Sequence, residues 1–146
     1  MLKSSIKLTG KVNIKKYENG ELIDNINIDN IIVTNGQNYI AQRILNNTTT
    51  AMTHMGIGSS QVPQTVDDTA LFQEILRNTF VTGTVTNSQV EYVASFAAPV
   101  SGSRSITEAG IFNAASAGTL LCRTTFPPVT QTTGQTIAIS WVISVG

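Results

Sequence analysis

The chain has 146 residues, of which only 12% are charged, and nine basic and nine acidic residues give a formal net charge of zero. This length suits one domain with a sizeable core, and the low charge argues against a dedicated surface for nucleic acid. A single cysteine excludes an internal disulfide framework. No stretch reaches the length of an apolar membrane span, and no apolar leader opens the chain, so we expect neither a transmembrane segment nor a signal peptide.

The first expected unit is a β-hairpin over residues 5–34. Apolar and polar residues alternate along 5–16, which is the pattern of a half-buried strand. Asn19 and Gly20 form the strongest short turn signal for a hairpin, and residues 21–34 are the return strand. The apolar phase flips at Asp29 and Asn30, which predicts either a β-bulge or a crossing from one sheet to another.

Two helices are predicted. Tyr39, Ile40 and Ile44 recur at helical spacing within residues 37–47, and Asn35 is the expected cap. A second, shorter helix is expected over 69–76, capped by one of three polar residues just before it. The capping candidates are Thr65, Asp67 and Asp68, and the expected inward-facing residues are Leu71, Phe72, Ile75 and Leu76.

The remaining segments read as strands. Residues 52–58 alternate, and 78–86 with 89–97 suggest a hairpin through Asn87 and Ser88. A further hairpin is expected over 105–129, with a small-residue turn at 114–118, and Pro127 and Pro128 are expected to end its second strand. Residues 137–145 are apolar on both faces, which predicts a central strand with Trp141 as a core anchor.

About eight strands with short connections predict an all-β fold with one or two short helices. We expect one domain over residues 1–146, containing the hairpin 5–34 and the helix 37–47. The leading architecture is an antiparallel β-sandwich of jelly-roll-like type. A partly closed barrel is the alternative.

Residues capable of catalysis or metal binding are scarce. His54 is the only histidine and Cys122 the only cysteine, so neither a Ser–His–Asp triad nor a zinc site can be assembled convincingly. We expect no cofactor, and a buried, unreactive Cys122. Glu91 and Glu108 are the remaining candidates for a pair of catalytic acids, but Glu91 is expected to be solvated.

Glu108 lies among apolar neighbours, where an unpaired carboxylate would be costly to bury. We therefore expect it to form an ion pair with Arg77 or Arg123. The second charge feature is a basic stripe near the start of the chain. It comprises Lys3, Lys7, Lys11, Lys15 and Lys16. Acidic residues follow on the paired strand, so cross-strand neutralisation is favoured over nucleic-acid binding.

Several motifs in order suggest a family. The segments are Thr53–Gly58, Pro63, Asp67–Leu71, Glu74, Arg77, Ile106–Asn113, Leu120–Arg123, Phe126–Val129 and the closing strand 137–145. Together they resemble a domain that recurs in structural proteins of tailed bacteriophages. The resemblance covers nearly the whole chain and consists of apolar, glycine and turn positions, so it transfers no functional residue.

The resemblance implies a non-enzymatic virion component with a β-rich fold. We expect an auxiliary or decoration protein docked on the capsid or its fibres, made in the bacterial cytoplasm and located in the virion. The alternative is a tail fibre, collar or baseplate component that binds a receptor or carbohydrate through exposed Tyr17, Tyr92 or Trp141. The expected partners are other virion proteins and further copies of this chain, with a trimer as first guess.

Overall fold

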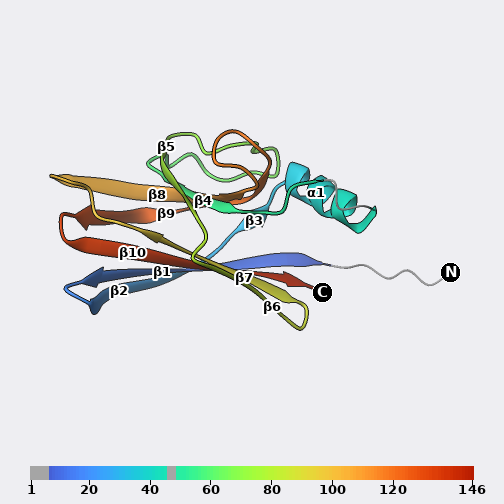
Figure 1. The fold of residues 1–146 in the computed structure, drawn as a ribbon. Helices are drawn as coiled ribbons and strands as arrows, with labels where there is room; N and C mark the ends of the chain where they lie inside the picture. Colours follow the sequence, from blue (N-terminus) through green and yellow to red (C-terminus); the bar gives the residue numbers. More distant parts are fainter. Residues whose placement is uncertain (1–6, 46–48) are drawn as a thin grey trace.

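The computed structural model describes residues 7–45 and 49–146. Within these residues, ten strands and one helix follow one another along the chain (Figure 1). The elements are β1 (Leu8–Glu18), β2 (Glu21–Asp29), β3 (Ile31–Ile32), α1 (Thr34–Leu45), β4 (His54–Gly58), β5 (Glu74–Thr79), β6 (Thr82–Thr86), β7 (Gln89–Phe96), β8 (Ser103–Phe112), β9 (Leu120–Thr132) and β10 (Gln135–Val145).

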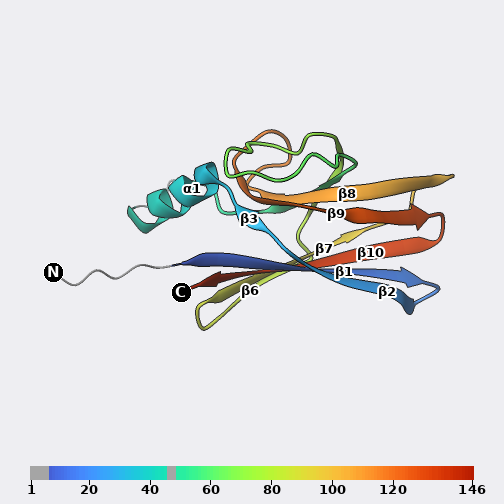
Figure 2. The ribbon, with the colours of Figure 1, turned by 180° about the vertical axis from the view of Figure 1, so that it is seen from behind.

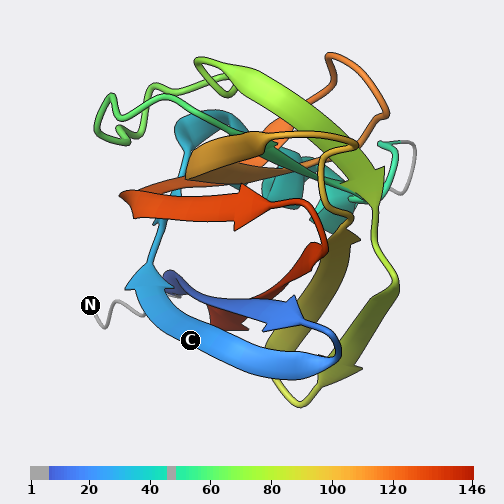
Figure 3. The same cartoon turned by 90° about the vertical axis from the view of Figure 1, so that its left-hand side faces the viewer.

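The strands form two five-stranded sheets that lie face to face (Figure 3). Sheet A has the order β2-β1-β10-β7-β6, and sheet B has the order β3-β9-β8-β4-β5. All strand pairs are antiparallel. The predicted all-β, antiparallel β-sandwich is therefore confirmed.

The opening hairpin turns where the sequence places the turn. Asn19 and Gly20 both have positive φ angles, of 53° and 81°, as a tight two-residue hairpin turn requires. The phase flip after Asp29 marks a crossing between sheets, since β2 belongs to sheet A and β3 to sheet B. The chain bridges the two layers at this point, and the apolar side chains change face because they enter a different sheet.

One cluster of buried side chains fills the space between the sheets. Strand β10 lies at the centre of sheet A, as expected, and its alternate residues point into this cluster. Trp141 is fully buried there, together with Ile137 and Ile139. Phe96 and Ile111, from strands of different sheets, belong to the same cluster, so the two layers share one core.

The expected helix over 69–76 is wrong. Strand β5 begins at Glu74 and pairs with β4, and the preceding residues have no regular structure. The backbone N–H groups of Phe72 and Gln73 donate to the Glu108 carboxylate, so a tertiary acceptor replaces the carbonyls of a helix. Leu71 is buried as expected, but Phe72 and Ile75 are exposed.

Strand β9 does not end at Pro127 and Pro128, contrary to expectation, but continues to Thr132. Ile106 pairs with Val129 while Glu108 pairs with Thr125, so the segment 126–128 lies opposite one residue of β8. This bulge accommodates both prolines, because residues in a bulge need not donate to the ladder.

Helix α1 begins at Thr34, three residues before the predicted start. Asn35 therefore lies inside the helix and does not cap it. Tyr39 is buried as the apolar spacing predicts, but Ile44 and Leu45 are 82% and 84% exposed. The prediction that Ile44 shares the buried face of the helix is therefore wrong. The predicted end at residue 47 lies outside the described residues. Helix α1 is too short to cross a membrane, and no described helix of the chain meets that requirement.

The predicted hairpin of 78–86 with 89–97 is correct from Thr82 onward, but its first residues belong to a different strand. Strand β5 ends at Thr79 in sheet B, whereas β6 and β7 pair in sheet A through the turn at Asn87 and Ser88. The β6–β7 hairpin and α1 lie at the same end of the molecule (Figure 2).

Candidate functional site

Glu108 lies on β8 with its side chain fully buried. Its carboxylate accepts four hydrogen bonds, three of them from the backbone of the connection between β4 and β5. The donors are Ser60 N at 3.1 Å, Phe72 N at 3.0 Å, Gln73 N at 2.8 Å and Arg123 Nε at 3.1 Å. The carboxylate therefore ties an irregular loop to the sheet.

Arg123, on the neighbouring strand β9, is also fully buried and bridges two acids. Its guanidinium forms the ion pair with Glu108 and a second one with Asp68 at 3.0 Å, and it donates to the Val62 carbonyl at 3.0 Å. The exposed Phe72 ring lies 4.5 Å from the guanidinium carbon and shields it. We call Asp68, Glu108 and Arg123 the buried triad.

Asp68 is nearly as buried as its partners and is oriented by its own turn. Its carboxylate accepts from Thr65 N at 2.9 Å and from Thr65 Oγ1 at 3.1 Å, in addition to Arg123. Thr65 and Asp68 were expected to cap a helix, and they close a loop turn instead. The triad places one guanidinium between two carboxylates, and each carboxylate also accepts hydrogen bonds from the loop, which suits a structural role.

Arg77 does not reach Glu108 but pairs with Glu74 on its own strand, through two contacts of 2.7 Å. It also donates to the carbonyls of Ala114 and Ala117, at 3.0 and 2.9 Å. The guanidinium carbon lies 3.5 Å from the centre of the Phe112 ring. Arg77 thus attaches strand β5 to the turn between β8 and β9.

The other candidate residues are dispersed. His54 Nδ1 lies 2.7 Å from Thr53 Oγ1, and burial raises the pKa of the Cys122 thiol well above its ordinary value, which makes the thiol unreactive. Glu91 is exposed on β7 and accepts from Ser140 Oγ at 2.9 Å. Over residues 7–45 and 49–146, no three His, Cys, Asp or Glu side chains gather as a metal site would require.

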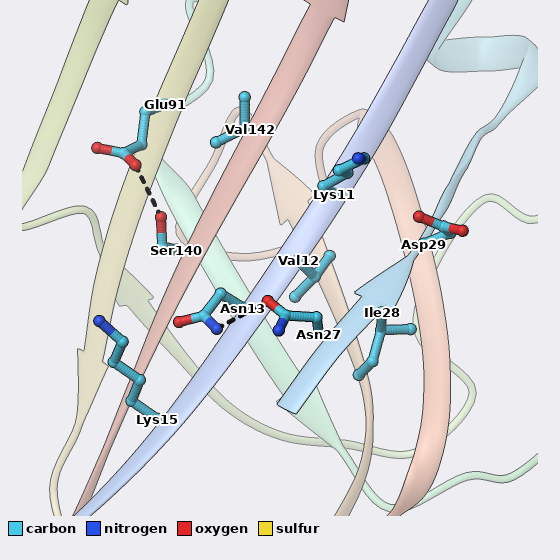
Figure 4. A pocket seen from close by; sticks show the side chains of 10 residues that line it. All are labelled: Lys11, Val12, Asn13, Lys15, Asn27, Ile28, Asp29, Glu91, Ser140 and Val142. Carbon is cyan, nitrogen blue, oxygen red and sulfur yellow. Dashed lines mark hydrogen bonds between the residues drawn. The ribbon is translucent and has the colours of Figure 1, made fainter. Parts of the chain in front are cut away.

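A polar groove of about 560 Å³ crosses the outer face of sheet A (Figure 4). Asn13 lies on its floor and donates to the side-chain oxygens of Asn25 and Asn27, at 2.6 and 2.9 Å. The groove is lined by Lys11, Val12, Asn13, Lys15, Asn27, Ile28, Asp29, Glu91, Ser140 and Val142. Lys11 lies opposite Asp29 in the strand register, as cross-strand neutralisation predicts, but no lysine of the described stripe forms an ion pair within the described residues.

A second groove, of about 520 Å³, is mainly apolar and runs between α1 and the β6–β7 hairpin. Its floor is the stacked pair of Phe80 and Tyr92, whose ring centres are 4.5 Å apart. Burial raises the pKa of Tyr92 to about 12. Ile44 and Val85 form the rims, and both side chains are largely exposed. The sequence singled out Tyr92 but not this groove, because its two walls are far apart along the chain.

Comparisons with family models, with curated proteins and with solved structures give no match. The residues and their geometry are therefore the basis on which a function can be assigned.

Proposed function

We propose that the protein is a non-enzymatic structural component of a tailed-bacteriophage particle, an auxiliary or decoration protein docked on the capsid or its fibres. In this role the chain supplies a rigid β-sandwich and one or more contact surfaces. Its partners are other virion proteins and further copies of itself.

The observation that carries the proposal is the convergence of the buried triad. Asp68, Glu108 and Arg123 each belong to a different segment of the resemblance to phage structural proteins, and they meet in one network. The three segments of the resemblance that contain these residues are therefore in contact through buried ion pairs. The convergence supports the view that the resembling residues form one structural unit.

The surface chemistry supports the same proposal. The strongest charge cluster is enclosed, whereas apolar side chains are exposed at the α1 end of the molecule, among them Ile44, Leu45 and Val85. Exposed apolar groups that gather around a groove are typical of protein contact sites. They suit a subunit that is covered by its neighbours in an assembly.

The test is to locate the protein in phage particles purified by density gradient from a producing culture. We expect a fixed copy number per particle by quantitative mass spectrometry, and antibody–gold label at one place on the particle by electron microscopy. The proposal would be contradicted if purified particles contained the other virion proteins but not this one, and if this protein were found only in the fraction that is not bound to particles.

A second candidate is a tail fibre, collar or baseplate component that binds a receptor or carbohydrate. The polar groove of Figure 4 favours it, because amide, carboxylate and ammonium groups line one hollow. Trp141 takes no part, since it is fully buried. Calorimetry with host surface polysaccharide is the measurement, and Asn27→Ala should weaken binding while Gln61→Ala, on an exposed loop, should not. No heat of binding for the unaltered protein would remove this candidate.

A further inference from the structure

Two open five-stranded sheets have four edges, and three of them carry features that discourage pairing with another chain. Strand β2 carries Asp24 and Asp29, and β5 carries the Glu74–Arg77 ion pair. Strand β3 is only two residues long, and the part of β9 that extends beyond it contains the bulge with Pro127 and Pro128. Short edges and charged side chains are the usual protection of exposed strands. These three edges are therefore poor sites for a further strand.

Strand β6 is the unprotected edge. Its sequence, Thr-Gly-Thr-Val-Thr, contains no charged residue and no proline, and every one of its residues is exposed. Its register with β7 runs without a shift from Thr82 to Thr86. A straight, uncharged edge of this kind presents unpaired backbone groups to any compatible strand.

The orientation of the free backbone groups follows from the turn. Thr86 and Gln89 close a two-residue loop, so Thr86, Thr84 and Thr82 direct their N–H and C=O groups toward β7. The alternation holds from Thr82 to Thr86 and breaks at Val81, whose N–H donates to the Val93 carbonyl at 2.8 Å, so Val81 and Thr82 both lie opposite Val93 in a bulge where β6 begins. Gly83 and Val85 therefore direct their backbone groups to the open edge.

We propose that β6 pairs antiparallel with β6 of a second copy of this chain, about a twofold axis at Thr84. Gly83 of each copy then lies opposite Val85 of the other, and these two pairs exchange four backbone hydrogen bonds. The two sheets A become one continuous sheet across the dimer. This inference rests on the proposal that the protein acts by assembly, and it names the contact surface.

The side chains match in size and in charge. Gly83 leaves space on the groove side of the sheet, where an added methyl would meet only the Tyr92 ring, at 3.8 Å. Val85 of the second copy fills this space and covers the edge of Tyr92. Because β6 has no charge, two copies meet here without bringing like charges together, whereas self-pairing of β2 would oppose carboxylates.

Neighbouring apolar groups extend the contact. Val85 is 74% exposed and Val81 62%, and Ile44 of α1 lines the same groove as Val85. Pairing along β6 removes part of this apolar surface from water, which favours association. Strand β6 of a second copy would therefore bond the free backbone groups of β6 and also cover part of the exposed apolar surface beside it.

Sedimentation analysis over a range of concentrations tests the association. We expect a reversible dimer for the unaltered protein and at least a tenfold higher Kd for Val85→Lys, because a lysine on an edge strand opposes pairing. Val100→Lys is the matched control, since Val100 is fully exposed in the loop between β7 and β8, and it should dimerise normally. Circular dichroism confirms that both variants are folded.

Cross-linking tests the register. In the proposed dimer the two Thr84 residues form a non-hydrogen-bonded pair, with Cα atoms about 4.5 Å apart, close enough for a disulfide. Thr84→Cys should therefore form disulfide-linked dimers under mild oxidation. Thr86→Cys should not, because its two copies lie about four residues apart along the ladder, roughly 13 Å.

A monomer at all concentrations, a trimer, a dimer insensitive to Val85→Lys, or equal cross-linking at positions 84 and 86 would each overturn the inference. These outcomes are separate from the location of the protein in a particle. A particle-bound protein that fails these tests would disprove the β6 contact alone. A β6 dimer that is absent from particles would disprove the phage role alone.

Discussion

At the scale of single residues, Arg123 is the charged side chain whose burial depends most on its partners. Its guanidinium is fully buried between two carboxylates, and the desolvation of three charges is offset only while each keeps its partners. Removing the cation would leave Asp68 and Glu108 as buried, adjacent anions. The triad is therefore far more sensitive to loss of one member than an exposed ion pair.

Arg123→Met should lower the free energy of unfolding by about 3–5 kcal/mol, the usual cost of leaving a buried charge without its partner. Urea denaturation measures the change, and Lys11→Met, on the exposed outer face of sheet A, is the control, with an expected change within about 0.5 kcal/mol. Glu108→Gln should also be destabilising, because each carboxylate oxygen accepts two hydrogen bonds and the amide NH2 group would face two of the four donors around this position. Equal midpoints for Arg123→Met and Lys11→Met would show that the triad adds no stability.

Tyr92 gives a prediction about alkaline pH. Burial raises the pKa of Tyr92 to about 12, from its ordinary value of 10.0. The folded state therefore retains this proton more tightly, so its contribution to stability is complete below pH 10 and is lost as the pH rises from 10 to 12. Tyr92→Phe keeps the ring on Phe80 and should show a smaller loss of stability over this range than the unaltered protein. Parallel stability curves for the two proteins would contradict the assignment.

At the scale of elements, strands and turns could be predicted because their signals are local. Asn19 and Gly20 determine a turn by their own backbone preferences, and the alternating residues of β10 determine a buried face. The loop before β5 could not be predicted, because its hydrogen bonds go to Glu108, more than thirty residues away. The bulge at Pro127 was missed for the same reason, since its form depends on the register with β8.

The candidate site was predictable only in part. Burial of a carboxylate among apolar residues indicates that a cation must be near, which identified Glu108 and left Arg77 and Arg123 as its alternatives. Asp68 was missed as the third member because a helix cap explained it equally well. The two grooves had no sequence signal, since each is built from side chains of several strands that alternate with residues of the opposite face.

Gly58 gives a prediction about the contact between β4 and the loop. A methyl group on Gly58 would overlap both the Gln73 carbonyl and the Glu108 carboxylate, two groups that are fixed by their hydrogen bonds. Gly58→Ala should therefore cost about 1–3 kcal/mol, as overpacking of a rigid site does. Gly83→Ala, where the added methyl makes ordinary contact within the chain, is the matched control when both changes are made in the Val85→Lys variant, in which the β6 contact is absent, and it should change stability by less than about 0.5 kcal/mol. Similar denaturation midpoints for both variants would show that the loop can move away.

At the scale of the whole molecule, the four passages of the chain between the sheets bind the two layers into one unit. These passages are β2 to β3, β5 to β6, β7 to β8 and β9 to β10. Because each sheet contains strands from well-separated parts of the described chain, we expect the two sheets to form together. The resemblance to phage structural proteins suggested a trimer, whereas the β6 edge favours a twofold contact. The molar mass of the protein measured in solution distinguishes these two predictions.

The shared core leads to a prediction about unfolding. Trp141 in sheet A and Ile111 in sheet B lie in the same buried cluster, so loss of one sheet exposes the inner face of the other. We therefore expect a single cooperative transition in urea, with the same midpoint for Trp141 fluorescence and for far-ultraviolet circular dichroism. The Val85→Lys variant is the suitable protein for this measurement, because association would make the midpoint depend on concentration. A fluorescence midpoint that precedes the loss of strand signal would mean that sheet A opens alone, and would contradict a single folding unit.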